Sequence, residues 1–277
     1  MAIELTTKFS PHVDEMFTAE SKKDLITNQD YEWSGAHSIK VYKVNTVEMN
    51  DYDRNGTNGG TSRYGEVKDL DSTTEEMTLK RDRSFTFVID RLDEDETQQA
   101  ISAASALARQ MRQVVIPEVD QYTYGIMCEN AGLQPEATEI TAENIYTMIV
   151  EGNKALDDNL VPETGRNIVV TPDVYTAMKK CPDITMETDI GNELRLKGVI
   201  AIVDGCNVIK VPAPRLPEDF GFMICHPVAT VAPTKLESYK THVDPPGING
   251  SLVEGRICYD AFVLDNKATA IYYQRKA

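Results

Sequence analysis

The sequence lacks any apolar run approaching the roughly 20 residues that a membrane-spanning helix needs. Its first thirty residues mix polar, acidic and basic side chains, which is typical of neither a signal peptide nor a transit peptide. Cysteine is also scarce, and its five positions are scattered and odd in number: Cys128, Cys181, Cys206, Cys225 and Cys258. This pattern favours reduced thiols in a cytoplasm over a framework of disulfides.

Basic residues are in short supply. The 28 lysines and arginines face 44 aspartates and glutamates, so the formal net charge is −16. Along the sequence, no Lys/Arg cluster supplies the basic face that tight binding to nucleic acid requires. The acidity instead favours a surface that stays in solution or lies near DNA without adhering to it.

The motifs of common enzymes are missing too. There is no GxGxxG, GxxxxGK[ST], GxSxG or CxxC, and His12, His37 and His242 share no metal-ligand spacing. Cys225 and His226 are adjacent, but neighbouring residues on a strand point to opposite faces, which is unsuitable for a nucleophile and its base. We therefore expect no catalytic residue, no cofactor and no metal.

One stretch partly matches a calcium-binding loop. Asp51, Asp53 and Asn55 precede a turn glycine, as in the first half of an EF-hand. Ser62 occupies the position of the bidentate glutamate, and neither flank has a helical pattern. A Gly/Asn-rich hairpin tip explains the stretch better, and calcium at these three residues stays open as an alternative.

A long amphipathic helix over residues 93–129 organises the rest of the chain. Its apolar residues recur at steps of three and four along one face. Asp93 has the character of an N-cap, with Glu96 placed to complete a capping box. Pro117 predicts a kink, because proline removes one backbone hydrogen bond and clashes with the preceding turn.

Two strand-like segments precede this helix. Residues 38–49 and 75–90 are rich in alternating apolar residues, and the Gly/Asn-rich stretch 51–65 lies between them. Together they predict an extended hairpin. Because its outer half is polar on both faces, and an isolated hairpin is marginally stable in water, we expect it to lie on another subunit.

The remainder predicts a mixed body. Between 131 and 230, Thr141 is expected to cap a helix, 167–170 to form a buried strand, and Thr171 with Pro172 to begin another helix. Asp204-Gly205 is a strong hairpin signal between 199–203 and 206–211, and 220–225 is another apolar strand. Further strands are predicted at 235–243, 255–264 and 268–274, with a rigid turn at 245–250. The fold class is therefore α+β.

Several stretches, in this order, carry a resemblance to a known family: SFTFVIDRLDEDET at 84–97, GVIAIVDGCNVIKVP at 198–212, and the long closing stretch that begins HPVATVAPTKLESYKTHVDPPGING at 226. The chain resembles the tailed-bacteriophage major capsid proteins of the Hong Kong 97-type fold over nearly its whole length. The resemblance implies an N-terminal arm (1–37), an extended loop (38–90), a peripheral domain with a spine helix (91–130 and 231–264) and an axial domain (131–230 and 265–277).

The resemblance also implies a function. Such proteins assemble as hexamers and pentamers into an icosahedral shell that encloses double-stranded DNA, so the chain would be made in a host bacterial cytoplasm and end in the virion. The first 37 residues contain no long charged helix that could act as a built-in scaffold, so a separate scaffolding protein is an expected partner, as are a portal and decoration proteins. Contact with the packaged DNA should be weak, and no contact with a membrane is expected.

Candidate subunit-interface residues follow from these expectations: Arg54, Asn55 and Tyr64 at the hairpin tip, Lys80, Arg81 and Arg83 on its return strand, and Pro245, Pro246 and Asn249 in the turn. Two alternatives remain open. One is the shell of an encapsulin-like nanocompartment, and the other is an unrecognised metal-dependent or thiol enzyme.

Overall fold

The structure is a computed structural model, which describes residues 20–28, 30–31, 38–44, 46–56, 62–66, 68–70, 72–96, 102–182, 184 and 199–277. The chain divides into two compact units. The smaller is Trp33–Leu79, and the larger comprises Met1–Glu32 and Lys80–Ala277. No helix in the described part of the chain combines the length and apolar character that crossing a bilayer requires.

The smaller unit contains one antiparallel pair, β1 (Ser38–Val44) and β2 (Ser72–Thr78). The predicted return strand 75–90 is therefore wrong as a single strand, because β2 ends at Thr78 and a second strand, β3 (Arg81–Asp90), belongs to the larger unit. Between them, the N–H group of Lys80 donates to the Asp260 carboxylate (2.8 Å). The pairing of β3 with the larger unit overrides the hairpin pattern.

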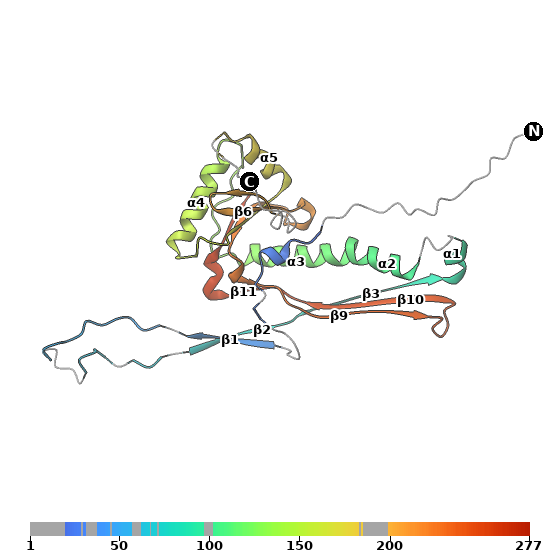
Figure 1. Ribbon diagram of the computed structural model, residues 1–277, viewed down its shortest axis with the longest axis horizontal. Helices are drawn as coiled ribbons and strands as arrows, with labels where there is room; N and C mark the ends of the chain where they lie inside the picture. The colour runs from blue at the N-terminus through green and yellow to red at the C-terminus, as the bar shows by residue number, and fades with distance from the viewer. Residues whose placement is uncertain are drawn as a thin grey trace, which may run out of the picture. The chain divides into compact units, whose positions relative to one another are not determined.

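In the larger unit, β3 forms a three-stranded antiparallel sheet in the order β3-β10-β9, with β9 at Thr234–Val243 and β10 at Gly250–Tyr259 (Figure 1). Phe85 of β3 lies across Gly255 of β10 and stacks on Tyr239 of β9 (centroids 6.1 Å apart). A Cβ atom at position 255 would come within 2.3 Å of the Phe85 ring, so the aromatic contact requires glycine there.

The long helix begins later than predicted. Asp93 lies inside a separate short helix, α1 (Arg91–Glu96), so it does not cap the long one; at the start of α1 the Asp90 carboxylate accepts the Leu92 N–H (2.8 Å). Ser102 caps α2 (Ala103–Gln110) through its hydroxyl. Residues 97–101 lie outside the described part of the chain, and with them the continuity predicted between 93 and 102.

Just before Pro117, where the sequence predicts a kink, a π-helical turn, η2 (Met111–Val115), joins α2 to α3 (Ile116–Glu129). The N–H group of Ile116 bonds to the carbonyl of Met111, five residues back. Pro117 follows shortly after this turn inside a continuous helical segment, since Gln110, Val115 and Ile116 all have helical backbone angles.

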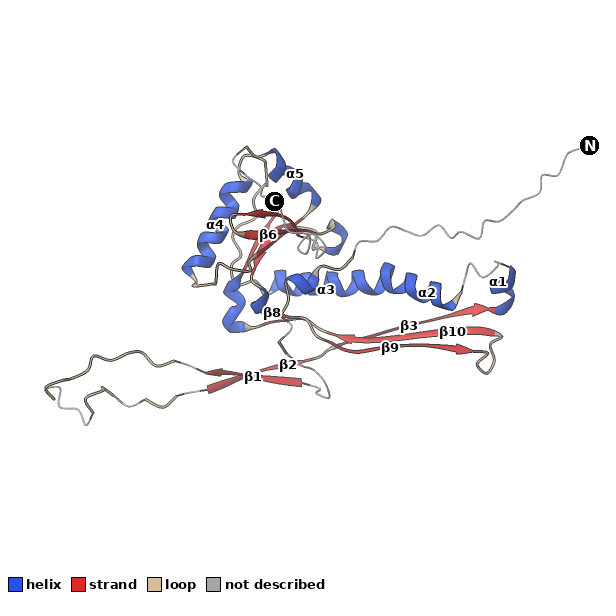
Figure 2. Ribbon diagram, viewed as in Figure 1, coloured by secondary structure: helices blue, strands red, loops and turns tan. Residues whose placement is uncertain are grey.

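A small core joins this helix to the three-stranded sheet. Val115 and Val119 pack against Ile257 and Tyr259, with Phe85 at the edge. In Figure 2, the segment from α2 to α3 runs along β3, β10 and β9. Residues 81–90 are therefore held by the larger unit's own interior.

The main core surrounds a five-stranded sheet in the order β12-β7-β4-β6-β5, in which only β4 and β6 run parallel. Its elements are β4 (Asn167–Val170), β5 (Val199–Val203), β6 (Cys206–Lys210), β7 (Phe220–Cys225) and β12 (Ile271–Arg275), with α4 (Ile145–Asp158) and α5 (Pro172–Lys180). Strands β4 and β7 are buried at every residue. All these strands fall within 131–230 and 265–277.

Several local predictions for this part are confirmed. The Thr171 hydroxyl caps α5 by accepting the Val174 N–H (3.3 Å), and Asp204 and Gly205 turn β5 into β6 with positive φ angles of 49° and 73°. The predicted cap at Thr141 is wrong. Helix α4 begins at Ile145, and the Asn144 side chain instead accepts the Thr141 N–H (2.8 Å).

The closing strands differ slightly from prediction. The stretch 255–264 contains the end of β10 and a separate strand, β11 (Phe262–Val263), which pairs with β8 (Thr230–Val231). Residues 265–270 form a 3₁₀ helix, η5, so the last strand starts at Ile271. Three more 3₁₀ turns complete the fold: η1 (Lys23–Leu25), η3 (Ala213–Arg215) and η4 (Pro227–Ala229).

The described part of the expected N-terminal arm packs on its own body. Ile26 is fully buried in the main core, and Asn28 bridges to Val231. A buried ion pair joins Asp120 of α3 to Arg215 (2.7 Å), and the Ser21 hydroxyl donates to the same carboxylate (2.6 Å). These contacts fix residues 20–28 to the larger unit.

Candidate functional site

Three donors converge on Asp260, in the loop after β10. Its carboxylate, 3% exposed, accepts the Tyr122 hydroxyl (2.7 Å) and the N–H groups of Lys80 (2.8 Å) and Ala261 (2.9 Å). Burial, reinforced by the bond to Asp260, raises the pKa of Tyr122. This network fixes the point where the chain enters β3.

Two arginines of β3 make contacts with α3 next to this network, one a cation–π contact and the other an ion pair. The guanidinium of Arg81 lies over the Tyr122 ring, 4.5 Å from its centroid. Arg83 donates to Glu118 (2.7 Å), and the Tyr259 hydroxyl donates to the same carboxylate (3.2 Å). Burial raises the pKa of Tyr259 to about 12, so its hydroxyl remains a donor at neutral pH.

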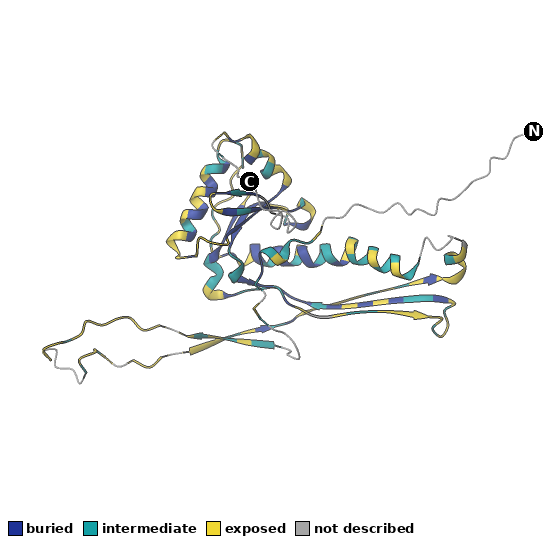
Figure 3. Cartoon of the chain, in the orientation of Figure 1, coloured by how far each residue is buried: buried dark blue, intermediate teal, exposed yellow. Residues whose placement is uncertain are grey.

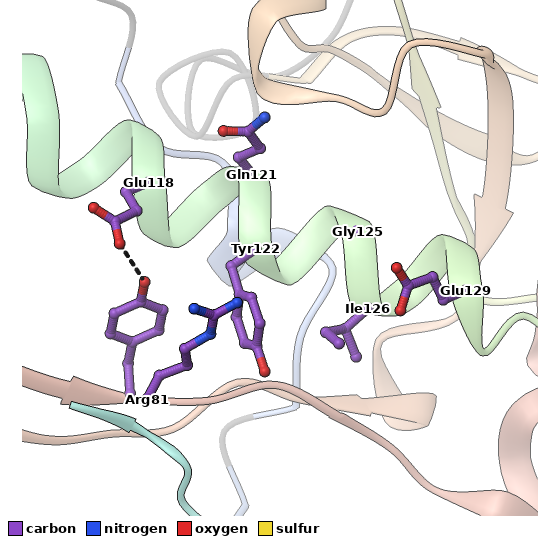
Figure 4. A pocket seen from close by; sticks show the side chains of 8 residues that line it. Arg81, Glu118, Gln121, Tyr122, Gly125, Ile126 and Glu129 are labelled. Carbon is purple, nitrogen blue, oxygen red and sulfur yellow. Dashed lines mark hydrogen bonds between the residues drawn. The ribbon is translucent and has the colours of Figure 1, made fainter. Parts of the chain in front are cut away.

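A hollow of about 520 Å³ lies on the side of α3 and is bordered by Arg81, Glu118, Tyr122 and Tyr259 (Figure 4). Its lining is completed by Gln121, Gly125, Ile126 and Glu129. A Cβ atom built on Gly125 would meet nothing within 4 Å. Glycine in a helix interior costs about 1 kcal/mol relative to alanine, and no contact within the described chain explains it here. The hollow offers a polypeptide segment close approach to the helix, between an arginine and two glutamates.

The hairpin-tip candidates lie on the smaller unit and are exposed. Tyr64 packs edge-on against Tyr52 (centroids 5.1 Å apart), and Asp53 accepts the Asn55 N–H (3.2 Å), which is an Asx turn. The side chain of Arg54 is exposed beside it. Aromatic and polar groups are therefore presented together near this tip.

The turn candidates lie between β9 and β10. The Asn249 carbonyl accepts the Arg91 N–H (3.0 Å), and the turn closes through a bond from the Asp244 N–H to the carbonyl of Gly250 (2.7 Å). Gly250 has φ 146°, and a Cβ atom there would lie 2.2 Å from a backbone oxygen. Pro246 is exposed and Pro245 half-buried, so the turn presents a rigid apolar edge.

Of the nine candidates, the structure brings Lys80, Arg81 and Arg83 together beside α3. They belong to the larger unit and not to an outer hairpin, so that part of the prediction is wrong. Lys80 contributes through its backbone, whereas both arginines contribute side chains.

The residues that complete this site were missed at the sequence level. They lie far in the sequence from the residues they contact: Glu118 is 35 positions from Arg83, and Asp260 is 180 positions from Lys80. The third is Tyr122, whose ring lies under Arg81. Glu118 and Tyr122 read simply as parts of an amphipathic helix. The one local signal was Gly125, a glycine inside a long apolar helical pattern.

The alternatives for chemistry gain no support from geometry. Cys225 is fully buried, and burial raises its pKa. The His226 ring contacts the Thr164 carbonyl (3.1 Å) and accepts the Val228 N–H. Within the described residues, no group of three or more His, Cys, Asp or Glu side chains is arranged to hold a metal ion.

Comparison with known proteins places the fold. No protein-family profile and no curated protein matches the sequence. Among solved structures, the chain superimposes on one of Mycobacterium phage Che8 with a TM-score of 0.77 at 18% identity, covering 98% of this chain and 96% of that one. A capsid structure of the cyanophage P-SCSP1u gives 0.73 at 14%, covering 98% and 93%, and the mature capsid of bacteriophage PhiM1 gives 0.72 at 14%, covering 99% and 92%.

The chain has the fold of phage capsid proteins. The match spans nearly the whole of both chains in each of these three comparisons.

Proposed function

We propose that the chain is the major capsid protein of a tailed bacteriophage. In this proposal its copies assemble as hexamers and pentamers into an icosahedral shell that encloses double-stranded DNA, and it has no catalytic role. Residues 1–37 act as the arm and 38–79 supply the extended loop, whereas β3 (Arg81–Asp90) lies in a sheet of the larger unit and is not part of that loop. The peripheral domain (91–130 and 231–264) and the axial domain (131–230 and 265–277) form the wall.

One observation carries this proposal. The smaller unit exposes several large apolar side chains. Figure 3 colours most of its described residues as exposed or intermediate. Met49 is 99% exposed. The exposed large hydrophobic residues of this unit are Tyr42, Val44, Val47, Met49, Tyr52, Tyr64 and Leu70. Exposed apolar groups this concentrated mark a protein interface, and an isolated two-stranded hairpin gains stability when it packs on a partner.

Two further surfaces support assembly. The hollow around Gly125 can receive a segment of a neighbouring copy, because none of the described residues fills the space next to this glycine. The far end of the three-stranded sheet exposes Val88, Leu92 and Val243 beside the Pro245-Pro246 turn. We assign this end to contacts among several copies. A separate scaffolding protein, a portal and decoration proteins remain proposed partners.

The test is a substitution at the most exposed apolar position. Met49→Asp places a carboxylate where the proposed contact between copies excludes water, which is unfavourable. Each loss of about 1.4 kcal/mol in the binding free energy of a contact lowers its affinity about tenfold. We expect shells in negative-stain images from the unaltered chain and from the control Met49→Leu, and unassembled subunits from Met49→Asp. Normal shells from Met49→Asp, or none from the unaltered chain with its scaffolding partner, would refute the proposal.

The molecules enclosed in purified shells distinguish a phage capsid from an encapsulin-like compartment. Nuclease-protected double-stranded DNA in shells purified from infected cells supports the virion. A bound enzyme in place of DNA would favour the encapsulin-like alternative.

A further inference from the structure

Two lysines from distant parts of the sequence meet around one tyrosine, and a third bonds to the backbone of one of them. The ammonium groups of Lys179, at the end of α5, and Lys210, at the end of β6, lie 4.9 Å and 5.5 Å from the centroid of the Tyr175 ring. Lys22, just before η1, donates its ammonium group to the Lys210 carbonyl (3.1 Å). We call Lys22, Lys179 and Lys210 around Tyr175 the lysine patch.

The patch concentrates positive charge without acidic partners for its two outer lysines. No carboxylate in the described residues forms an ion pair with Lys179 or Lys210. Their ammonium groups share one ring and so lie within roughly 10 Å of each other, about one Debye length at 0.1 M salt. Burial and, next, the charge of Lys210 lower the pKa of Lys22, which is consistent with mutual repulsion. In a chain with a net charge of −16, such convergence calls for an explanation.

Local structure explains only part of it. Lys179 and its neighbour Lys180 lie in the last turn of α5, where the helix dipole favours cations. The helix dipole does not explain the position of Lys210, which is the last residue of strand β6, or of Lys22, which lies in the N-terminal segment. The half-buried Tyr175 ring makes cation–π contacts with Lys179 and Lys210, and both lysines remain exposed.

We propose that the lysine patch binds phosphate groups of the packaged DNA, as a defined contact point on an otherwise acidic wall. The proposal rests on the capsid function proposed above. Duplex DNA carries one phosphate per roughly 3.4 Å along each strand, so neighbouring phosphates can meet both outer lysines. Two or three such contacts give weak binding that does not depend on base sequence, which suits DNA that must still move while it is packed.

The test measures how binding of a labelled duplex of about 30 base pairs to the unassembled protein depends on salt, by fluorescence anisotropy between roughly 20 and 200 mM salt. Each phosphate contact contributes about 0.9 to the slope of log K against log salt. Lys179→Ala/Lys210→Ala should therefore reduce the slope by about 2 and weaken low-salt binding at least severalfold. The control Lys154→Ala/Lys240→Ala removes the same charge from exposed positions on α4 and β9 and should leave the slope unchanged.

The proposal is overturned if the double variant keeps the original slope, if the control loses as much, or if the unaltered protein binds no duplex at low salt. Binding of poly-glutamate in place of DNA would also overturn it, and would indicate an acidic polypeptide as the partner. Shell assembly is scored separately by microscopy. Patch-dependent DNA binding without shells would refute the capsid function alone, whereas normal shells without DNA binding would refute the patch alone.

Discussion

At the residue scale, Asp260 holds the site beside α3 together. One buried carboxylate accepts two backbone N–H groups and the Tyr122 hydroxyl, and thereby sets the course of the chain into β3. Its neighbours Arg81 and Arg83 were selected from the sequence because they are basic and lie next to a strand. Their partners could not be selected, since contacts across 35 to 180 residues leave no local trace in one sequence.

Asp260→Asn should destabilise the unassembled protein by about 2 kcal/mol, because the three bonds lose a charged acceptor and an amide N–H₂ group replaces one oxygen. Tyr122→Phe removes a single bond and should cost about 1 kcal/mol. Urea unfolding measures both free energies. The control Asp158→Asn, at an exposed position, should stay within about 0.5 kcal/mol of the unaltered chain. Equal losses for Asp260→Asn and Tyr122→Phe would show that the two N–H bonds contribute nothing.

At the element scale, local patterns predicted what local forces decide. Strands 167–170 and 220–225 were predicted because all of their residues except Asn167 are apolar. The cap at Thr171 was predicted because its hydroxyl acts within its own turn. The start of the long helix was misplaced because acids at 93–96 suit the first turn of any helix, including the short α1. The return strand was misassigned because β3 can pair with either β1 or β10, and only tertiary packing decides between them.

Gly125→Ala separates the needs of the helix from those of an interface. In the isolated chain the new methyl group meets nothing within 4 Å, so α3 should gain about 1 kcal/mol of stability. In the lattice the same methyl group should obstruct a neighbouring segment and reduce shell yield. Unfolding in urea and quantified micrographs give the two readouts.

The matched substitution Gly152→Ala in α4 should behave in the opposite way. Its methyl group would lie 2.8 Å from Ile224 and 3.1 Å from Tyr272, so overpacking should cost about 1–3 kcal/mol in the isolated chain. A stabilised Gly125→Ala chain that assembles as well as the unaltered one would remove the hollow from the list of contact surfaces.

At the scale of the whole molecule, composition was informative about class and uninformative about placement. The acidic balance argued against an extended basic face, yet it could not reveal that Lys179 and Lys210 meet at Tyr175 with Lys22 bonded to the Lys210 carbonyl, since these lysines are separated by up to 188 positions. The α+β class and the order of elements were recoverable from periodicity and resemblance. The boundary between the two units at Leu79 could not be predicted from the sequence, because it depends on whether β3 pairs within the smaller unit or within the larger one.

The division into two units leads to the last prediction. Among the described residues, neither the main core nor the small core beside α3 contains a residue from Trp33–Leu79. Replacing residues 46–70 with a short Gly-Ser linker should therefore leave the unfolding midpoint of the larger unit unchanged. The shortened chain should fold but form no shells, because five of the seven exposed apolar residues that we assign to the neighbour contact are gone and only Tyr42 and Val44 remain. Mixed with the full-length chain it should also lower shell yield, since it can accept a neighbour's hairpin without offering one. Circular dichroism and sedimentation measure the two effects, and shells of normal yield from the shortened chain alone would mean that the hairpin does not hold the lattice together.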